Sequence, residues 1–114
     1  MEFNELKPIY LQINDSLCER ILSGEVKAGD RIPSVREFGA EIGVNPNTVA
    51  RSYEKLTDAG IIFNKRGIGY FVSDEAKDII LEAERKEFLE NELPQILKRM
   101  ALLGIDPSVI TKNI

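Results

Sequence analysis

The chain has 114 residues, 43% hydrophobic and 30% charged, which is enough for one compact domain with a helical extension and is not typical of disorder. It has no histidine and one cysteine, which excludes histidine-based catalysis, histidine-containing metal sites and an internal disulfide. Neither a run of about 18 apolar residues nor a secretory signal is visible, so we expect no membrane span and a cytoplasmic location.

The net charge of −4 is unevenly distributed along the chain. Residues 1–30 carry three basic and six acidic side chains, residues 31–66 carry six and four, and residues 67–114 carry six and nine. The middle block is therefore the only positive one. Because the local field, and not the net charge, attracts a polyanion, residues 31–66 are the expected place for nucleic acid to bind.

A first helix is predicted from Pro8 to about Ser23, with Gly24 as its stop. The single cysteine lies in this helix and is interpreted as a buried structural thiol. The loop that follows is predicted to contain a short strand around Arg31 and Ile32. One apolar stripe, with a side chain every four residues, predicts the buried face of this helix: Ile9, Ile13, Leu17 and Ile21.

A second helix is predicted to begin at Ser34 and to be closed by Gly43. In its SVRE start, the serine hydroxyl and the glutamate carboxylate can satisfy each other's exposed backbone N–H groups as a capping box. A third helix follows almost at once, over about residues 46–59, with Asn45 as N-cap and Pro46 in the first helical position. Two helices joined by so short a glycine-containing turn are typical of a helix-turn-helix. The predicted buried stripe of the second helix is Val35, Phe38 and Ile42.

Two short β runs, IIFN and GYFVS, follow the third helix and are joined by the basic turn KRGI. They predict a hairpin. Three helices and a hairpin in this order predict a winged helix-turn-helix: a mostly α fold with a small β-hairpin, over residues 1–73, whose wing is residues 61–72.

Residues 74–114 are rich in Glu, Leu and Lys and predict a helical C-terminal region, either one kinked helix or two, since Pro94 removes a helical N–H and clashes with the preceding turn. Asp106 and Pro107 predict a last short helix to about Lys112. The region has too many apolar groups for a lone helix to expose, so we interpret it as a dimerisation surface, with folding back onto the monomer as the alternative. The predicted dimerisation residues are Ile80, Phe88, Leu89, Leu93, Ile96, Leu97 and Met100.

A turn of about 100° per residue divides the third helix into two faces. We expect Asn47, Thr48, Arg51, Ser52 and Lys55 on a polar face, and Val49, Ala50, Tyr53, Leu56 and Thr57 on a packed one. Amide, hydroxyl and cationic groups in one stripe can bind base edges and phosphates. A merely solvated face is the alternative reading of the stripe, but the short turn before it and the basic hairpin after it favour DNA. The predicted DNA-binding residues are Ser34, Arg36, Asn45, Asn47, Thr48, Arg51, Ser52, Lys65, Arg66 and Gly67.

Two of these assignments have simpler alternatives. Arg36 could pair with Glu37, Glu41 or Glu54, and Lys65 and Arg66 could be plain solubilising charges.

The segment RIPSVREFGAEIGVNPNTVARSYEKLTDAGIIFNKRGIGYFV resembles the DNA-binding domain of GntR-type bacterial transcription regulators. The matching elements are PSxRE, GVxxxTV, YEKLTDAG and RGxGxFV, and with the preceding helix the match covers about residues 8–73. The form VNPNTVARSY and a helical tail of about 40 residues are similar to the YtrA-like subfamily.

The resemblance implies a transcriptional regulator, expected to repress, that binds a near-palindromic operator as a homodimer. The third helix would enter the major groove and the wing would reach the minor groove. Many relatives have arginine at the positions of Pro46 and Ala50, so base reading by those arginines does not transfer, and Arg51 is expected to take over part of it. Gly39 stands where alanine is usual, which weakens the second helix unless it permits closer packing. The resemblance places DNA contacts at Arg36, Asn47, Thr48 and Gly67.

The alternative function is a winged helix used only for protein or RNA contact, which an acidic or apolar recognition face would indicate. An enzyme is disfavoured because no carboxylate pair and no phosphate-binding glycine loop stands out. No cofactor and no metal is expected. The sequence does not give the operator, the regulated genes, the choice between repression and activation, or whether a small-molecule effector binds between the tail and the winged domain.

Overall fold

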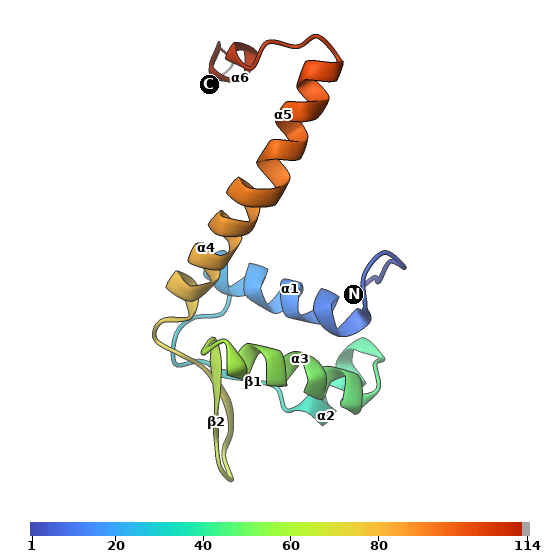
Figure 1. Ribbon diagram of the computed structural model, residues 1–114. Coiled ribbons are helices and arrows are strands. Elements are labelled where there is room, and N and C mark those ends of the chain that lie inside the picture. The colour runs from blue at the N-terminus through green and yellow to red at the C-terminus, as the bar shows by residue number, and fades with distance from the viewer. Residues whose placement is uncertain (113–114) are drawn as a thin grey trace. The chain divides into compact units, whose positions relative to one another are not determined.

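The computed structural model describes residues 1–112 of the chain (Figure 1). The chain forms two compact units, Met1–Leu81 and a second unit that begins at Glu82. Helix α4 (Ala76–Glu87) begins in the first unit, because Ala76 and Ile80 are buried in that unit's core. The composition changes at residue 74, but the first turns of α4 still belong to the winged unit.

Ile80 therefore corrects one sequence-based prediction. It was expected on the dimerisation surface, but only 2% of its side chain is exposed and it packs in the hydrophobic core of the first unit. The core of a winged unit this small extends into the helix that follows it, so an apolar residue in the first two turns of α4 packs in that core.

Three helices come before the hairpin: α1 (Ile9–Leu22), α2 (Val35–Ile42) and α3 (Pro46–Asp58). These limits almost coincide with the predicted ones. The stripe of α1 is confirmed except at its first position, since Ile9 is exposed while the other three side chains are buried. Helix α3 packs against both α1 and α2.

Both predicted helix caps are present. The backbone N–H of Glu37 donates to the hydroxyl of Ser34 at 3.1 Å, and the N–H of Ser34 donates to the Glu37 carboxylate at 3.3 Å. At α3, the N–H of Asn47 donates to the side-chain oxygen of Asn45 at 2.8 Å, and Pro46 occupies the first turn. These local bonds fix where the two helices begin and therefore which side chains α3 presents first.

The turn between α2 and α3 brings two stretches of backbone unusually close. Gly43 closes α2 in the left-handed conformation with φ 70°. A Cβ added to Gly39 would lie 2.6 Å from the carbonyl oxygen of Val44, closer than real Cβ atoms approach other atoms. The glycine at this position therefore permits the closer packing that the sequence left open.

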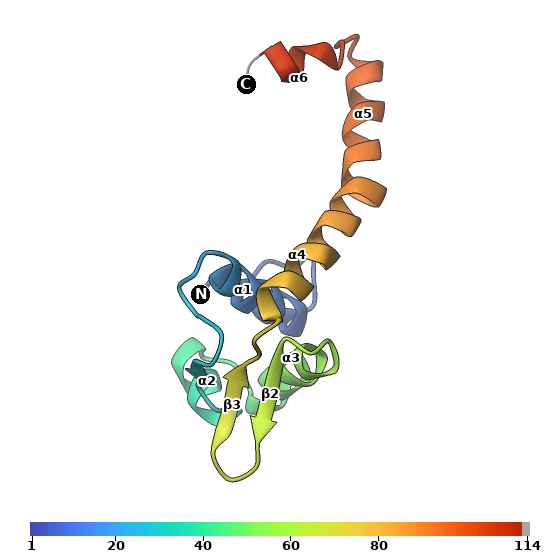
Figure 2. The same cartoon turned by 90° about the vertical axis from the view of Figure 1, so that its left-hand side faces the viewer.

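The three strands β1 (Arg31–Ile32), β2 (Ile62–Lys65) and β3 (Gly69–Val72) form an antiparallel sheet in the order β1-β3-β2. Arg31 of β1 and Phe63 of β2 are both paired with Phe71 of β3. The β2–β3 hairpin extends beyond the helices as the wing (Figure 2). The predicted fold, a mostly helical winged helix-turn-helix with a small β-sheet, is confirmed.

Tyr53 of α3 lies at the centre of the core and is completely buried. Its ring stands edge-on to Tyr70 of β3 with centroids 5.0 Å apart, and stacks with Phe38 of α2 at 6.5 Å. Burial raises the pKa of the Tyr53 hydroxyl above its ordinary value. One side chain thus joins α3 to the wing and to α2.

In the second unit, α4 is followed directly by a π-helical turn, η1 (Phe88–Glu92), and by α5 (Leu93–Leu102). Pro94 lies in the first turn of α5. The wider π turn directly before it makes room for the proline ring and is the place where the regular helical hydrogen bonding is interrupted. The last helix, α6 (Ser108–Lys112), begins where it was predicted, and Asp106 caps it by accepting the N–H of Ser108 at 2.9 Å. In the part of the chain that the structure describes, no helix is long and apolar enough to cross a membrane.

Candidate nucleic-acid interface

The exposed face of α3 is rotated relative to the predicted polar face. The buried side chains recur along one line, which is packed against the rest of the first unit: Val49, Ser52, Tyr53 and Leu56. Asn47 lies on the opposite, exposed line, Arg51 is also exposed, and Thr48 is half-buried at the edge of this face. Ala50 and Thr57, which were expected to be packed, are exposed.

Ser52 does not belong to the DNA-binding surface, and its prediction is corrected. None of its surface is exposed, and its hydroxyl has no hydrogen-bond partner among the described residues. The helical wheel placed it at the edge of the polar stripe, but this side of α3 is packed against the rest of the first unit. The serine side chain is small enough for this packed site, but its hydroxyl is buried there without a hydrogen-bond partner in the described part of the chain.

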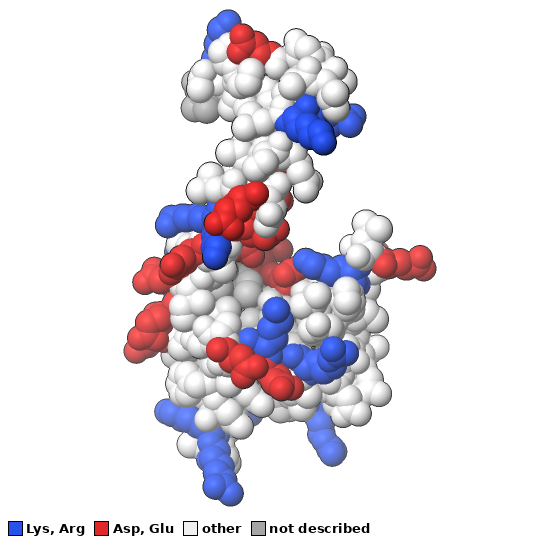
Figure 3. Space-filling view, in the orientation of Figure 1, with Lys and Arg blue, Asp and Glu red and all other residues white. Residues whose placement is uncertain are grey.

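Two carboxylates also share the exposed face of α3. Glu54 and Asp58 are both exposed, one and two turns beyond Arg51. Figure 3 shows acidic and basic side chains next to each other over this helix. The face is therefore not uniformly basic. Only its first part, from Asn47 to Arg51, lacks a carboxylate, and this is the part that can approach phosphate without repulsion.

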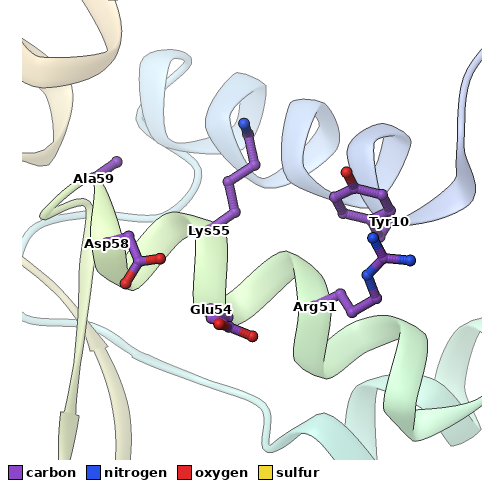
Figure 4. A pocket seen from close by; sticks show the side chains of 6 residues that line it. All are labelled: Tyr10, Arg51, Glu54, Lys55, Asp58 and Ala59. Atoms are coloured by element: carbon purple, nitrogen blue, oxygen red, sulfur yellow. The ribbon is translucent and has the colours of Figure 1, made fainter.

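Arg51 lies against the side chain of Tyr10, which comes from the first turn of α1. Its guanidinium carbon is 4.2 Å from the centroid of the tyrosine ring, within the range of a cation–π contact. The two side chains meet at one end of a surface hollow (Figure 4). The hollow is lined by Tyr10, Arg51, Glu54, Lys55, Asp58 and Ala59.

At the start of α2, Ser34 and Arg36 have different roles. The Ser34 hydroxyl already caps α2, as the Asn45 amide caps α3. Arg36 is exposed, and within residues 1–112 it forms no ion pair with Glu37. Glu37 pairs instead with Arg31. The cation of Arg36 is therefore directed to solvent in the same domain as the start of α3.

The tip of the wing carries the other predicted cations. Lys65, Arg66 and Gly67 are all exposed, and the N–H of Ile68 donates to the carbonyl of Lys65 at 2.9 Å to close the turn. Gly67 has φ 80°, a conformation in which a side chain would be strained. Basic atoms gather at the end of the hairpin in Figure 3. The wing therefore presents positive charge and bare backbone at its tip.

Arg31 is a residue of this surface that the sequence analysis did not select. Its Nε donates to the carbonyl oxygen of Ile68 at 3.4 Å, and its guanidinium lies 3.6 Å from the Glu37 carboxylate. It thereby connects the wing to the start of α2. The capping hydrogen bonds from Ser34, with a smaller contribution from Arg31, lower the pKa of Glu37 below its ordinary range. In the sequence, only the positive charge of the block 31–66 pointed to Arg31. Its contact with Ile68 depends on the pairing of β1 with β3.

Residues 9–72 of the chain match the family described as bacterial regulatory proteins, gntR family. The chain belongs to this family. It is 34% identical to the uncharacterized HTH-type transcriptional regulator YhcF of Bacillus subtilis, over 99% of this chain and 92% of that protein. It is 37% identical to the HTH-type transcriptional repressor YtrA of the same organism, over 87% of this chain and 75% of that protein. It also matches the solved structure of a GntR family transcriptional regulator from Listeria monocytogenes with a TM-score of 0.81 and 32% identity, over 98% of this chain and 99% of that one.

The protein is thus a YtrA-like member of the gntR family, a DNA-binding transcriptional regulator with a winged helix-turn-helix. In this gntR-family regulator, the structure brings most of the predicted DNA-binding residues to the surface of α2, α3 and the wing, and Ser52 is the exception. Within residues 1–112 no group of three or more His, Cys, Asp or Glu side chains could hold a metal ion.

The predicted dimerisation residues fall into three groups. Ile80 is buried in the first unit, while Leu93 and Met100 are partly buried in the second. The remaining four are exposed in the second unit: Phe88, Leu89, Ile96 and Leu97.

Proposed function

We propose that this regulator binds a near-palindromic DNA operator as a homodimer and represses transcription from it. The observation that carries the proposal is the start of α3. There Asn47, Thr48 and Arg51 offer amide, hydroxyl and guanidinium groups on turns without a carboxylate. Arg36 of α2 is exposed in the same domain. These are the group types that bind base edges and phosphates.

The start of α3 is assigned to the major groove, which admits an α-helix, and the wing to the adjacent minor groove. Asn47 and Thr48 are the base-reading candidates, since they occupy the first turn and carry neutral hydrogen-bonding groups. Lys65 and Arg66 supply phosphate contacts, and Gly67 allows the wing backbone to approach DNA closely. The proposed contact residues are Ser34, Arg36, Asn45, Asn47, Thr48, Arg51, Lys65, Arg66 and Gly67.

A second copy of the chain is the proposed partner of the second unit. Many large apolar side chains are exposed there, more than a surface helix normally leaves in contact with water. A two-fold protein also suits a two-fold operator, because one half-site gives little specificity alone. The exposed apolar residues are Phe88, Leu89, Ile96, Leu97, Leu102, Leu103, Ile105, Val109 and Ile110.

Repression is proposed because a dimer seated on an operator blocks access to the DNA beneath it, and the similar YtrA of Bacillus subtilis is itself a repressor. The site of action would be the cytoplasm, where operator DNA lies. No catalytic step is part of this function, and a small-molecule effector would act by changing the affinity for DNA.

The test measures the binding of purified protein to a fluorescent duplex, recovered by selection from a randomised library, across a range of salt concentrations. If each subunit neutralises about 4 phosphates, the logarithm of the binding constant falls against the logarithm of salt concentration with a slope of about −7. A slope near −2, or no recovered duplex, would contradict groove binding by a dimer.

A further inference from the structure

The contact between Arg51 and Tyr10 distinguishes this arginine from a side chain that extends straight into a groove. In the described part of the chain no hydrogen bond or ion pair occupies its N–H groups, although Glu54 lies one turn away on the same helix. A cation–π contact occupies only the part of the guanidinium that meets the ring and leaves the other N–H donors free. Arg51 is therefore fixed in direction but still able to bind an anion.

The backbone that carries Tyr10 is held in place, because the start of α1 is fastened to the segment before it. The side-chain amide of Gln12 donates to the carbonyls of Asn4 at 2.8 Å and Lys7 at 2.7 Å, and its oxygen accepts the N–H of Asn4 at 3.1 Å. Tyr10 is also partly buried. These bonds make the first turn of α1 a firm support for the arginine.

The stacking also directs the guanidinium toward α1, away from the exposed line that Asn47 occupies at the start of α3. Figure 4 shows the Arg51 side chain leaving α3 in the direction of Tyr10. When a helix enters the major groove, side chains on its flank meet the sugar–phosphate backbone at the groove edge, and those on its outermost line meet the bases.

We infer that Tyr10 is a positioning residue that holds Arg51 for a backbone phosphate at the groove edge, so that Arg51 adds affinity and not sequence preference. The inference rests on the proposed function. Arg51 was expected to read a base in place of the arginines that many relatives have at the positions of Pro46 and Ala50. In this inference it binds a phosphate, and base reading is left to the neutral groups of Asn47 and Thr48.

The experiment compares wild-type protein with the variants R51A, Y10L, Y10F and the double variant R51A/Y10L. Each is titrated by fluorescence anisotropy into the duplex selected by the wild-type protein and into a scrambled duplex of the same composition. R51A is expected to weaken binding to both duplexes about 10-fold for each subunit bound, since it removes one charge-assisted contact per subunit. The salt slope should become shallower by about 1 for each subunit bound.

Y10L is expected to weaken binding to both duplexes about 3-fold for each subunit bound, because each subunit loses one exposed cation–π contact. Y10F keeps the ring and should bind like the wild type. The double variant should bind no more weakly than R51A, because Tyr10 acts only through Arg51. Equal binding by Y10L and wild type, additive losses in the double variant, or a selective loss on the selected duplex in R51A would each overturn the inference.

R51K provides the same test without altering α1, in case Y10L melts at a lower temperature. Lysine keeps the charge but lacks the planar group that stacks, so positioning predicts a loss of about 3-fold or more. Wild-type binding by R51K would show that charge alone suffices and would overturn the positioning. Failure to recover any duplex would instead overturn the proposed function, and this inference with it.

Discussion

The hydroxyl of Tyr53 in α3 donates a hydrogen bond of 2.7 Å to the carbonyl oxygen of Pro33, just before α2 begins. This bond fastens α3 to the segment that leads into the capping box of Ser34 and Glu37. The aromatic ring is surrounded by Phe38 and Tyr70, so the hydroxyl lies at the edge of the core and not in water. This partly buried polar contact thus adds to the packing that sets the spacing of α2 and α3.

Replacing Tyr53 with phenylalanine should lower the free energy of unfolding by about 1–3 kcal/mol, because the Pro33 carbonyl loses its partner while the packing of the ring is kept. Urea unfolding followed by circular dichroism measures this change. Y10F is the matched control, since it removes a tyrosine hydroxyl outside the core. An unchanged midpoint for Y53F would show that water replaces the lost bond.

Ser52→Ala should leave the stability unchanged or raise it by up to about 1 kcal/mol, because a buried hydroxyl without a partner is replaced by a methyl group. Operator affinity should stay at the wild-type level. Asn47→Ala, on the exposed line of the same helix, should weaken operator binding by about 1–3 kcal/mol. Weakened binding by S52A at full stability would return Ser52 to the DNA surface.

The capping carboxylate of Glu37 should make stability depend on pH. Its pKa is lower in the folded protein than its ordinary value of 4.5, so the folded state binds fewer protons than the unfolded state in acid. The stabilisation is fully present above that ordinary value and is lost as the pH falls through the folded pKa.

Glu37→Gln keeps an acceptor for the Ser34 N–H but cannot titrate. Urea unfolding between pH 7 and about pH 3 should therefore show a smaller acid loss of stability in E37Q than in wild type. Glu41→Gln, on the same helix but outside the cap, is the control. Parallel pH profiles for E37Q and wild type would contradict this role.

Leu89→Glu should convert the proposed dimer to a monomer, because a charge in an apolar interface loses its water without gaining a partner. Leu89 is 60% exposed, so the substitution should not unfold the chain. Sedimentation velocity measures the mass, and operator affinity should fall at least about 10-fold with the loss of one half-site. Leu6→Glu, in the first unit at a side chain 96% exposed, is the control. A dimeric L89E would place the interface elsewhere.

The features that were predictable from the sequence are local ones. The capping box, the Asn45 cap, the glycine stops and the basic hairpin turn depend on residues a few positions apart, and all were predicted. Ser52 and Ile80 were wrongly assigned for a common reason. Ser52 is a small polar residue at the edge of a stripe, and Ile80 is an apolar residue at the start of the tail. Whether such a residue is buried depends on which other parts of the chain pack against it.

Arg31 illustrates the same limit for contacts across the sheet. Its bond to the Ile68 carbonyl follows from the antiparallel pairing of β1 with β3, which joins positions far apart in sequence. The contact of Arg51 with Tyr10 likewise needs the packing of α1 along α3. Composition indicated a basic region, but which cations support the fold and which remain free for DNA is decided by tertiary structure.

The carboxylates of Glu54 and Asp58 on α3 have a consequence for the geometry of docking. A recognition helix lying flat along the groove would bring its second half beside the phosphates, where these two acids are repelled. A tilted approach, with the first turn deepest and the far end lifted out, keeps both carboxylates in solvent. For the proposed entry of α3 into the major groove, the acids thus favour a steep angle and a short footprint, in which each subunit would read few base pairs.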